Sequence, residues 1–160
     1  MPSDIPCPQR WFDDYEAGER FTFGTTTIDE AEIIEFGRKF DPQPFHIDPD
    51  AARESIFGGL IASGWHTGSI VMRLLNDEFL GPSSMGSPGL DELRWLAPVR
   101  PGDRLTLVAE VLEVIPSRSK PDRGIVKMAH ELVNQDRTTV VRSVANMMIA
   151  RHPSTQSAAT

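Results

Sequence analysis

Two residues that can transfer protons, Asp41 and His46, lie in segment 40–48, which reads FDPQPFHID. A carboxylate beside an imidazole can accept and return protons near neutral pH. Pro42 and Pro44 lack a backbone N–H and disfavour helical conformation in the residue before each. We therefore expect a stiff extended or turning loop, neither helix nor strand, that could hold an acid/base pair. The alternative is that Asp41 and Pro42 only open a turn and that His46 is a loop histidine with no role in catalysis.

A second stretch rich in glycine follows at 58–66 and reads GGLIASGWH. The order Asp-x-x-Pro-x-His, an acidic residue, an alanine pair and Ile-Ala-x-Gly resembles the MaoC-like (R)-specific enoyl-CoA hydratases of the hot-dog superfamily. The resemblance extends roughly from Trp11 to Ala150. Either stretch alone is a weak signal, but the linked pair is fairly specific.

The resemblance implies reversible hydration of a trans-2-enoyl-CoA to an (R)-3-hydroxyacyl-CoA. In this reading Asp41 and His46 are the catalytic dyad that activates water and exchanges its protons. The amide of Gly64, at a helix N-terminus, would stabilise the enolate oxygen, because free amides and the helix dipole favour negative charge there. Gly64 could instead serve only close helix packing.

Three further residues are expected to bind the substrate. The family often has Asn at the position of Gln43 and His at the position of Ser63. Gln43 keeps the amide with one more methylene, whereas Ser63 lacks a ring, and both changes bear on substrate choice more than on reaction type. Trp65 is a bulky residue that would bound the pocket beside Gly64. We expect His66 to lie on the helix surface or in the core.

The remaining candidates have simpler interpretations. Asp48 reads as a helix cap, His130 lies in a strand pattern and His152 lies near the C-terminus. Asp41, His46 and Asp48 do not form a metal site, because the sequence offers no third ligand at a recognised spacing. We therefore expect neither a metal nor a cofactor. Five basic residues could contact the phosphates of CoA or be solvated surface charges: Arg94, Arg100, Arg118, Lys120 and Arg123.

Periodicity and turn residues predict the elements that position these groups. We expect a strand at 20–28, a helix capped by Asp29 that ends at Asp41, and a short helix after Asp48. A long helix at 60–79 has a broad stripe of apolar and small residues. Four more strands follow at 89–96, 104–115, 124–134 and 138–150.

This order predicts an α+β hot-dog fold, in which a curved antiparallel five-stranded sheet wraps around a long central helix. In segment 104–115, residues 105, 107, 109, 111 and 113 should share one face. We expect one domain over residues 11–152, a flexible proline-rich arm at 1–10 and a disordered tail at 153–160. Sheets of this superfamily usually pair across a dimer, so a homodimer or a larger homo-oligomer of dimers is expected.

Composition and net charge narrow the classes of protein to which this chain can belong. The 160 residues are 39% hydrophobic and 24% charged, which is typical of a globular domain. The net charge of −7 argues against nucleic-acid binding. There is no membrane-length apolar run, no secretory signal pattern at residues 1–10 and one cysteine, so we expect a cytoplasmic protein with no internal disulfide.

Two other functions fit the same residues. A hot-dog acyl-CoA thioesterase would share the fold and ligand but direct water at the thioester carbonyl. A subunit that binds acyl thioesters without turnover would keep the fold and lose the chemistry. Release of free CoA identifies the first, and tight binding without turnover identifies the second.

Overall fold

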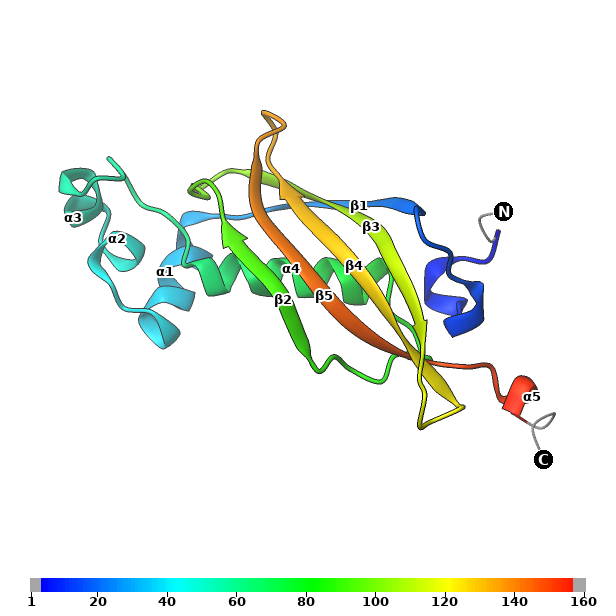
Figure 1. The fold of residues 1–160 in the computed structure, drawn as a ribbon. Helices are drawn as coiled ribbons and strands as arrows, with labels where there is room; N and C mark the ends of the chain where they lie inside the picture. Colours follow the sequence, from blue (N-terminus) through cyan, green and yellow to red (C-terminus); the bar gives the residue numbers. More distant parts are fainter. Residues whose placement is uncertain (1–3, 157–160) are drawn as a thin grey trace.

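The computed structural model describes residues 4–156. Five strands form one antiparallel sheet in the order β1-β3-β4-β5-β2, which leaves β1 and β2 as its edges (Figure 1). The strands are β1 (Arg20–Thr27), β2 (Gly89–Trp95), β3 (Arg104–Pro116), β4 (Arg123–Val133) and β5 (Thr139–Ala150). Their number, their sequence along the chain and their antiparallel arrangement are those expected from the sequence, whereas the order within the sheet was not predicted.

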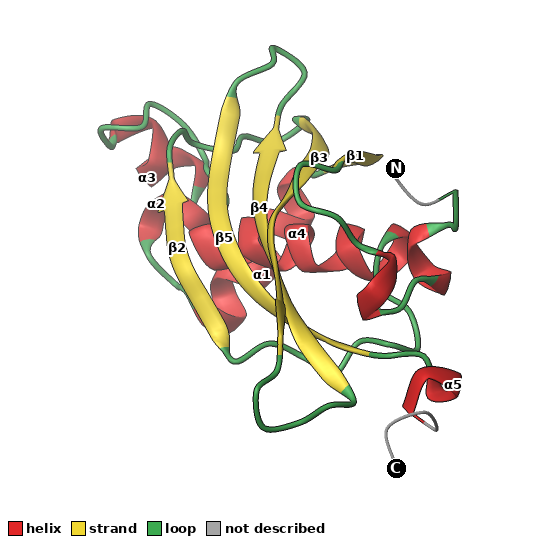
Figure 2. Ribbon diagram, turned by 45° about the vertical axis from the view of Figure 1, so that its right-hand side comes forward, coloured by secondary structure: helices red, strands yellow, loops and turns green. Residues whose placement is uncertain are grey.

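One long helix, α4 (Gly64–Glu78), runs across one face of this sheet (Figures 1 and 2). Three shorter helices gather near its N-terminal end: α1 (Glu30–Phe40), α2 (Pro44–Ile47) and α3 (Pro49–Glu54) (Figure 1). The other helical segments are η1 (Cys7–Gln9), η2 (Phe12–Asp14) and α5 (Pro153–Gln156). The N-terminus of α4 and the helices around it therefore lie at one end of the domain.

The core lies between α4 and the sheet. Alternate residues of β3, β4 and β5 are buried, as period-two patterning requires. On β3 the buried set runs from Leu105 to Val111 as predicted, but Glu113 is exposed. The reason is a bulge between Val111 and Glu113, which shifts the register and turns the strand's side chains over.

Side-chain caps fix the helices that lead to the loop. Asp29 and Glu32 form a reciprocal capping box: the Asp29 carboxylate accepts from the Glu32 amide at 2.8 Å, and the Glu32 carboxylate accepts from the Asp29 amide at 3.1 Å. Asp48 accepts from the amides of Asp50 and Ala51 at 2.9 and 3.2 Å, which confirms it as a helix cap. These caps fix where α1 and α3 begin.

Two predicted boundaries were wrong. Segment 40–48 is not all loop, because Pro44 occupies the first position of the one-turn helix α2, where a missing N–H costs nothing. The long helix begins at Gly64 rather than at residue 60. Residues 61 and 62 are instead held by neighbouring segments, since their amides donate to the carbonyls of Phe45 at 3.1 Å and Val99 at 2.9 Å.

Both ends of the described residues make defined contacts or structure, while the flexibility predicted for them stays a prediction. Arg10 is buried, and its guanidinium donates to the buried carboxylate of Glu19 at 2.8 Å. Residues 153–156 of the predicted tail form the short helix α5. The prediction of flexibility for residues 1–3 and 157–160 lies outside the described residues.

Candidate active site

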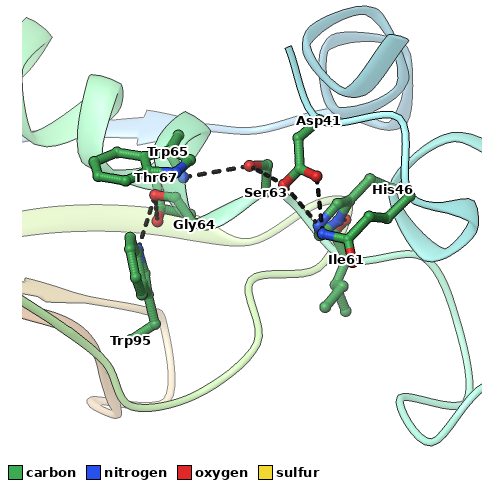
Figure 3. A network of polar contacts seen from close by, with 9 residues as sticks. Asp41, His46, Ile61, Ser63, Gly64, Trp65, Thr67 and Trp95 are labelled. Atoms are coloured by element: carbon green, nitrogen blue, oxygen red, sulfur yellow. Dashed lines mark hydrogen bonds and ion pairs between the residues drawn. The ribbon is translucent and has the colours of Figure 1, made fainter.

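Asp41 and His46 meet at the N-terminal end of α4 (Figure 3). Asp41 directly follows α1 as its C-cap, and His46 lies on the single turn of α2. Their contact joins Asp41 Oδ2 to His46 Nε2 at 3.2 Å. The proline-rich segment thus brings together the two residues proposed as a dyad.

The other nitrogen of His46 is held in the core. His46 is buried, and its Nδ1 lies 2.7 Å from the carbonyl oxygen of Ile61. A carbonyl can only accept, so Nδ1 carries a proton. Nε2 and the Asp41 carboxylate would then be two facing acceptors unless one further proton lies between them. The geometry therefore brings into contact two groups that can share one proton.

Asp41 receives two more hydrogen bonds. Gln43 Nε2 donates to Oδ1 at 2.8 Å, and Ser63 Oγ donates to Oδ2 at 2.7 Å. Partial burial acts to raise the pKa of Asp41, but the bonds from Gln43 and Ser63 and the proximity of His46 outweigh it. The pKa is therefore lowered, and the carboxylate form that accepts a proton is favoured.

Ser63 connects the dyad to α4. It caps the helix, because its Oγ also accepts from the amide of Trp65 at 3.3 Å (Figure 3). It is almost fully buried and does not line the cavity described below. Its hydroxyl bonds both Asp41 and the amide of Trp65, so Ser63 positions the carboxylate, and a role in substrate binding stays a prediction.

We expect Ser63→Ala to lower kcat about tenfold, the size of one lost hydrogen bond. Without that donor the pKa of Asp41 rises, so the acidic limb of the pH–rate profile moves to higher pH. Loss of the cap also lowers the free energy of unfolding by about 0.5–2 kcal/mol. Ser63→Thr keeps a hydroxyl and is the control. An unchanged acidic limb in Ser63→Ala would show that this bond does not tune Asp41.

The amide of Gly64 is the free donor at this helix end. Within the first turn, the amide of Trp65 is capped by the Ser63 hydroxyl, and those of His66 and Thr67 donate to the Ser63 carbonyl at 3.0 and 3.1 Å. Among residues 4–156 the Gly64 amide has no acceptor. Such an amide, at the positive end of the helix dipole, is suited to hold an oxyanion.

Trp95, which the sequence did not single out, packs directly on Gly64. Its Nε1 donates to the Gly64 carbonyl at 2.9 Å (Figure 3), and its ring forms an edge contact with Trp65 at 5.3 Å between centroids. A Cβ on Gly64 would lie 2.4 Å from the indole, so glycine is required here. Trp95 ends the edge strand β2, and no spacing in the sequence relates it to Gly64.

A cavity of about 380 Å³ opens at this group. The dyad lines it together with Gln43, Gly64 and Trp65, which are the predicted residues other than Ser63. Apolar side chains form most of the remaining wall: Phe45, Phe57, Ile61, Ala62, Trp95, Leu96, Ala97, Pro98 and Val99. The arrangement offers an apolar ligand one acid/base pair and one oxyanion donor.

One of the five basic residues is fixed beside this cavity. The guanidinium of Arg100 donates to the carbonyl of Phe57, a cavity residue, at 2.6 Å. Arg94 and Arg123 are instead paired with Glu92 and Asp122, at 3.2 and 2.8 Å. Arg100 is therefore hydrogen-bonded to a cavity residue, although it does not itself line the cavity.

Half-buried His66 and buried His130 do not line this cavity. His66 stacks on Phe36 with 4.7 Å between ring centroids, and His130 is buried on β4 as the strand pattern predicted. Burial lowers the pKa of His130 to about 4. Among the described residues, no cluster of three His, Cys, Asp or Glu could hold a metal, and no helix there is long and apolar enough to cross a membrane.

Lowered pH should destabilise the fold through His130. The unfolded ring binds a proton below about 6.5 and the folded ring only near 4, so the free energy of unfolding falls as pH drops through this window. The loss amounts to about 3 kcal/mol. Denaturant titrations at several pH values should show a shallower pH slope in His130→Leu. Met128→Leu, a buried change without a titrating group, should keep the wild-type slope. Equal slopes in all three proteins would contradict this assignment.

The chain is similar in sequence to known proteins over most of its length. Residues 14–134 match the MaoC like domain family. The uncharacterized protein YdeM of Bacillus subtilis is 29% identical over 140 residues, covering 87% of this chain and 98% of that protein. An (R)-specific enoyl-CoA hydratase of Rhodospirillum rubrum is 28% identical over 109 residues, covering 68% of this chain and 74% of the relative.

The fold of the chain is also similar to that of solved structures. The crystal structure of the MaoC-like dehydratase from Rhodospirillum rubrum is 44% identical, with a TM-score of 0.84 over 90% of this chain and 99% of that one. The R-hydratase PhaJ1 of Pseudomonas aeruginosa is 28% identical, with a TM-score of 0.74 over 92% of this chain and 88% of that one. These neighbours confirm the hot-dog, α+β fold expected from the sequence.

Proposed function

This chain belongs to the MaoC like domain family, and we propose that it is a hydro-lyase that reversibly hydrates a trans-2-enoyl-CoA to an (R)-3-hydroxyacyl-CoA. One observation carries the proposal: the Asp41–His46 contact of 3.2 Å lies in the same cavity as the unbonded amide of Gly64. The hydratase relative from Rhodospirillum rubrum supports the same reaction class.

The residues divide the reaction between them. The thioester carbonyl accepts from the Gly64 amide, which stabilises the enolate oxygen as it forms. Asp41 takes a proton from water while the water oxygen bonds to the β-carbon. The Nε2–H of His46 gives its proton to the α-carbon. Asp41 then returns a proton to His46 across their contact, so one water has been added and the dyad is restored.

The group that deprotonates water and the group that protonates the α-carbon lie in contact with each other on one side of the cavity, so water adds syn across the double bond. Gln43 and Ser63 act through Asp41, because each donates to one of its oxygens. The hydrogen bond from Arg100 to the cavity residue Phe57 supports Arg100 as a candidate to bind a CoA phosphate. No cofactor is required by this sequence of steps.

The product distinguishes this reaction from thioester hydrolysis. Incubation with a trans-2-enoyl-CoA, followed by chiral chromatography, should give the (R)-3-hydroxyacyl-CoA with the thioester intact. Release of free CoA thiol without this product would identify a thioesterase instead. Tight binding of the acyl-CoA with neither product would identify a binding subunit.

We also propose a homodimer that pairs along the β2 edge. Strand β2 leaves one side of its backbone unpaired, and large apolar side chains are exposed beside it. Leu90 is 51% exposed, Trp95 47% and Leu96 53%. Pairing of two β2 edges would extend the sheet and cover these side chains.

Light scattering should therefore give twice the monomer mass for the wild type, and Leu96→Lys should shift the equilibrium towards monomer. Ile56→Lys is the matched control, because Ile56 is 96% exposed on the loop after α3. A monomeric wild type, or a mass shift in the Ile56 variant alone, would contradict pairing at this edge.

A further inference from the structure

The proposed oxyanion donor is the amide of a glycine, the residue type with the greatest backbone freedom. A donor stabilises an oxyanion best when it is already aimed at the place where the charge develops. The carbonyl of Ser63 shares a peptide plane with the Gly64 amide, and it accepts from the amides of His66 and Thr67 at 3.0 and 3.1 Å. In a trans peptide the N–H lies opposite the carbonyl, so these bonds direct the Gly64 N–H out of the helix end.

Two side chains hold the other side of Gly64. Its carbonyl accepts from Trp95 Nε1 at 2.9 Å and from Thr67 Oγ1 at 2.8 Å (Figure 3). Thr67 belongs to α4 and moves with it, whereas Trp95 is the last residue of the edge strand β2. Trp95 is therefore the side chain that ties Gly64 to the sheet.

The indole of Trp95 also closes the space beside Gly64. A Cβ placed on Gly64 would lie 2.4 Å from Cε2, 2.5 Å from Nε1 and 2.9 Å from Cδ2 of Trp95. A ring this close blocks displacement of the glycine backbone towards β2. Trp95 is 47% exposed and lines the cavity that holds the dyad, so it lies at the site and not in the buried core.

We propose that Trp95 is a positioning residue for the oxyanion donor: it holds Gly64 from the sheet edge, so that the Gly64 amide stays aimed at the thioester carbonyl. This inference rests on the proposed function for the identity of the thioester ligand. Trp95 acts through Gly64 and takes part in no proton transfer.

Trp95→Phe keeps an apolar ring at the cavity wall and removes the indole N–H. We expect kcat to fall about tenfold, the size of one lost hydrogen bond. The ratio kcat/KM should fall by the same factor, as it does when an interaction made in the transition state is lost. Among residues 4–156 Trp95 has no hydrogen bond to Asp41 or His46, so the acidic limb of the pH–rate profile should not move.

The carbonyl stretching band of a bound thioester reports the oxyanion donor directly. Butyryl-CoA has no double bond to hydrate, so it stays intact in the site. Isotope-edited difference infrared spectroscopy should place this band at lower frequency in the wild-type complex than in free butyryl-CoA, because a hydrogen bond weakens the C=O bond. In Trp95→Phe the band should move back towards the frequency of the free ligand. A role in stability alone would leave the band of the folded protein unchanged.

Trp11→Phe is the matched control, because Trp11 packs on His152 and does not line the cavity. It should keep the wild-type kcat and the wild-type band. An isostere of tryptophan with sulfur in place of the N–H, inserted at position 95, keeps the volume of the indole and decides the question if Trp95→Phe does not fold. An unchanged band in both Trp95 variants would overturn the inference, as would a wild-type band at the frequency of free butyryl-CoA.

Hydration of crotonyl-CoA is measured in parallel. Hydration by the wild type, with the band unchanged in both Trp95 variants, would overturn this inference and leave the proposed function intact. A band displaced in the Trp95 variants, without hydration of any enoyl-CoA by the wild type, would support the positioning role and contradict the proposed function.

Discussion

Asp41→Asn is expected to lower kcat about 10²–10⁴-fold, the range that proton-transfer groups contribute. Asparagine has nearly the shape of aspartate and can keep contacts with Gln43 and Ser63, but it cannot accept a proton from water. The contact with His46 also loses its charge, so the proton on Nε2 is no longer held in place. Initial rates of enoyl-CoA hydration would measure the loss.

A second aspartate provides the control. Asp48→Asn removes a carboxylate of the same type that caps α3 and does not line the cavity. Asparagine caps helices about as well as aspartate, so this variant should keep both stability and activity. Near-wild-type activity in Asp41→Asn, with circular dichroism unchanged in both variants, would remove Asp41 from the mechanism.

Gly64→Pro is expected to lower kcat about 10²–10³-fold relative to Gly64→Ala, the range for one lost oxyanion donor. Proline is well tolerated at the first position of a helix and removes only the N–H. Ser63 already has φ −57° and ψ 141°, a conformation that suits the residue before a proline. The comparison therefore isolates the amide from the rest of the helix.

Both variants should be made in a Trp95→Ala background. Any Cβ at position 64 would collide with the indole of Trp95, and this background removes the collision equally for both. Gly64→Ala then carries the same Cβ with its amide intact. Equal kcat values for the two variants, both folded, would show that the amide does not stabilise the enolate.

Local patterns allowed much of the fold to be predicted. The caps at Asp29 and Asp48 and the alternation in 104–111 are short-range signals, and each appears in the structure as expected. The start of α4 was misplaced, because the apolar run from residue 60 reads as helix while its amides bond to distant segments. Tertiary hydrogen bonds overrode the local pattern there.

The site was predictable only in part, because some of its contacts join residues that are far apart in the sequence. The dyad is local, since its members lie within one proline-stiffened segment. The roles of Ser63 and Trp95 depend on contacts with Asp41 and Gly64 over longer separations in sequence, and no spacing reveals them. His130 was predicted to be a structural strand residue, and it is buried on β4.

The most direct test of the dyad's chemistry is the ultraviolet absorbance of a trans-2-enoyl-CoA, which depends on the conjugated thioester. We predict that the wild-type protein removes this absorbance with crotonyl-CoA or a longer enoyl-CoA, while a thiol reagent detects no free CoA. Constant absorbance with every chain length, or the appearance of free thiol in step with substrate loss, would contradict hydration as the reaction of this site.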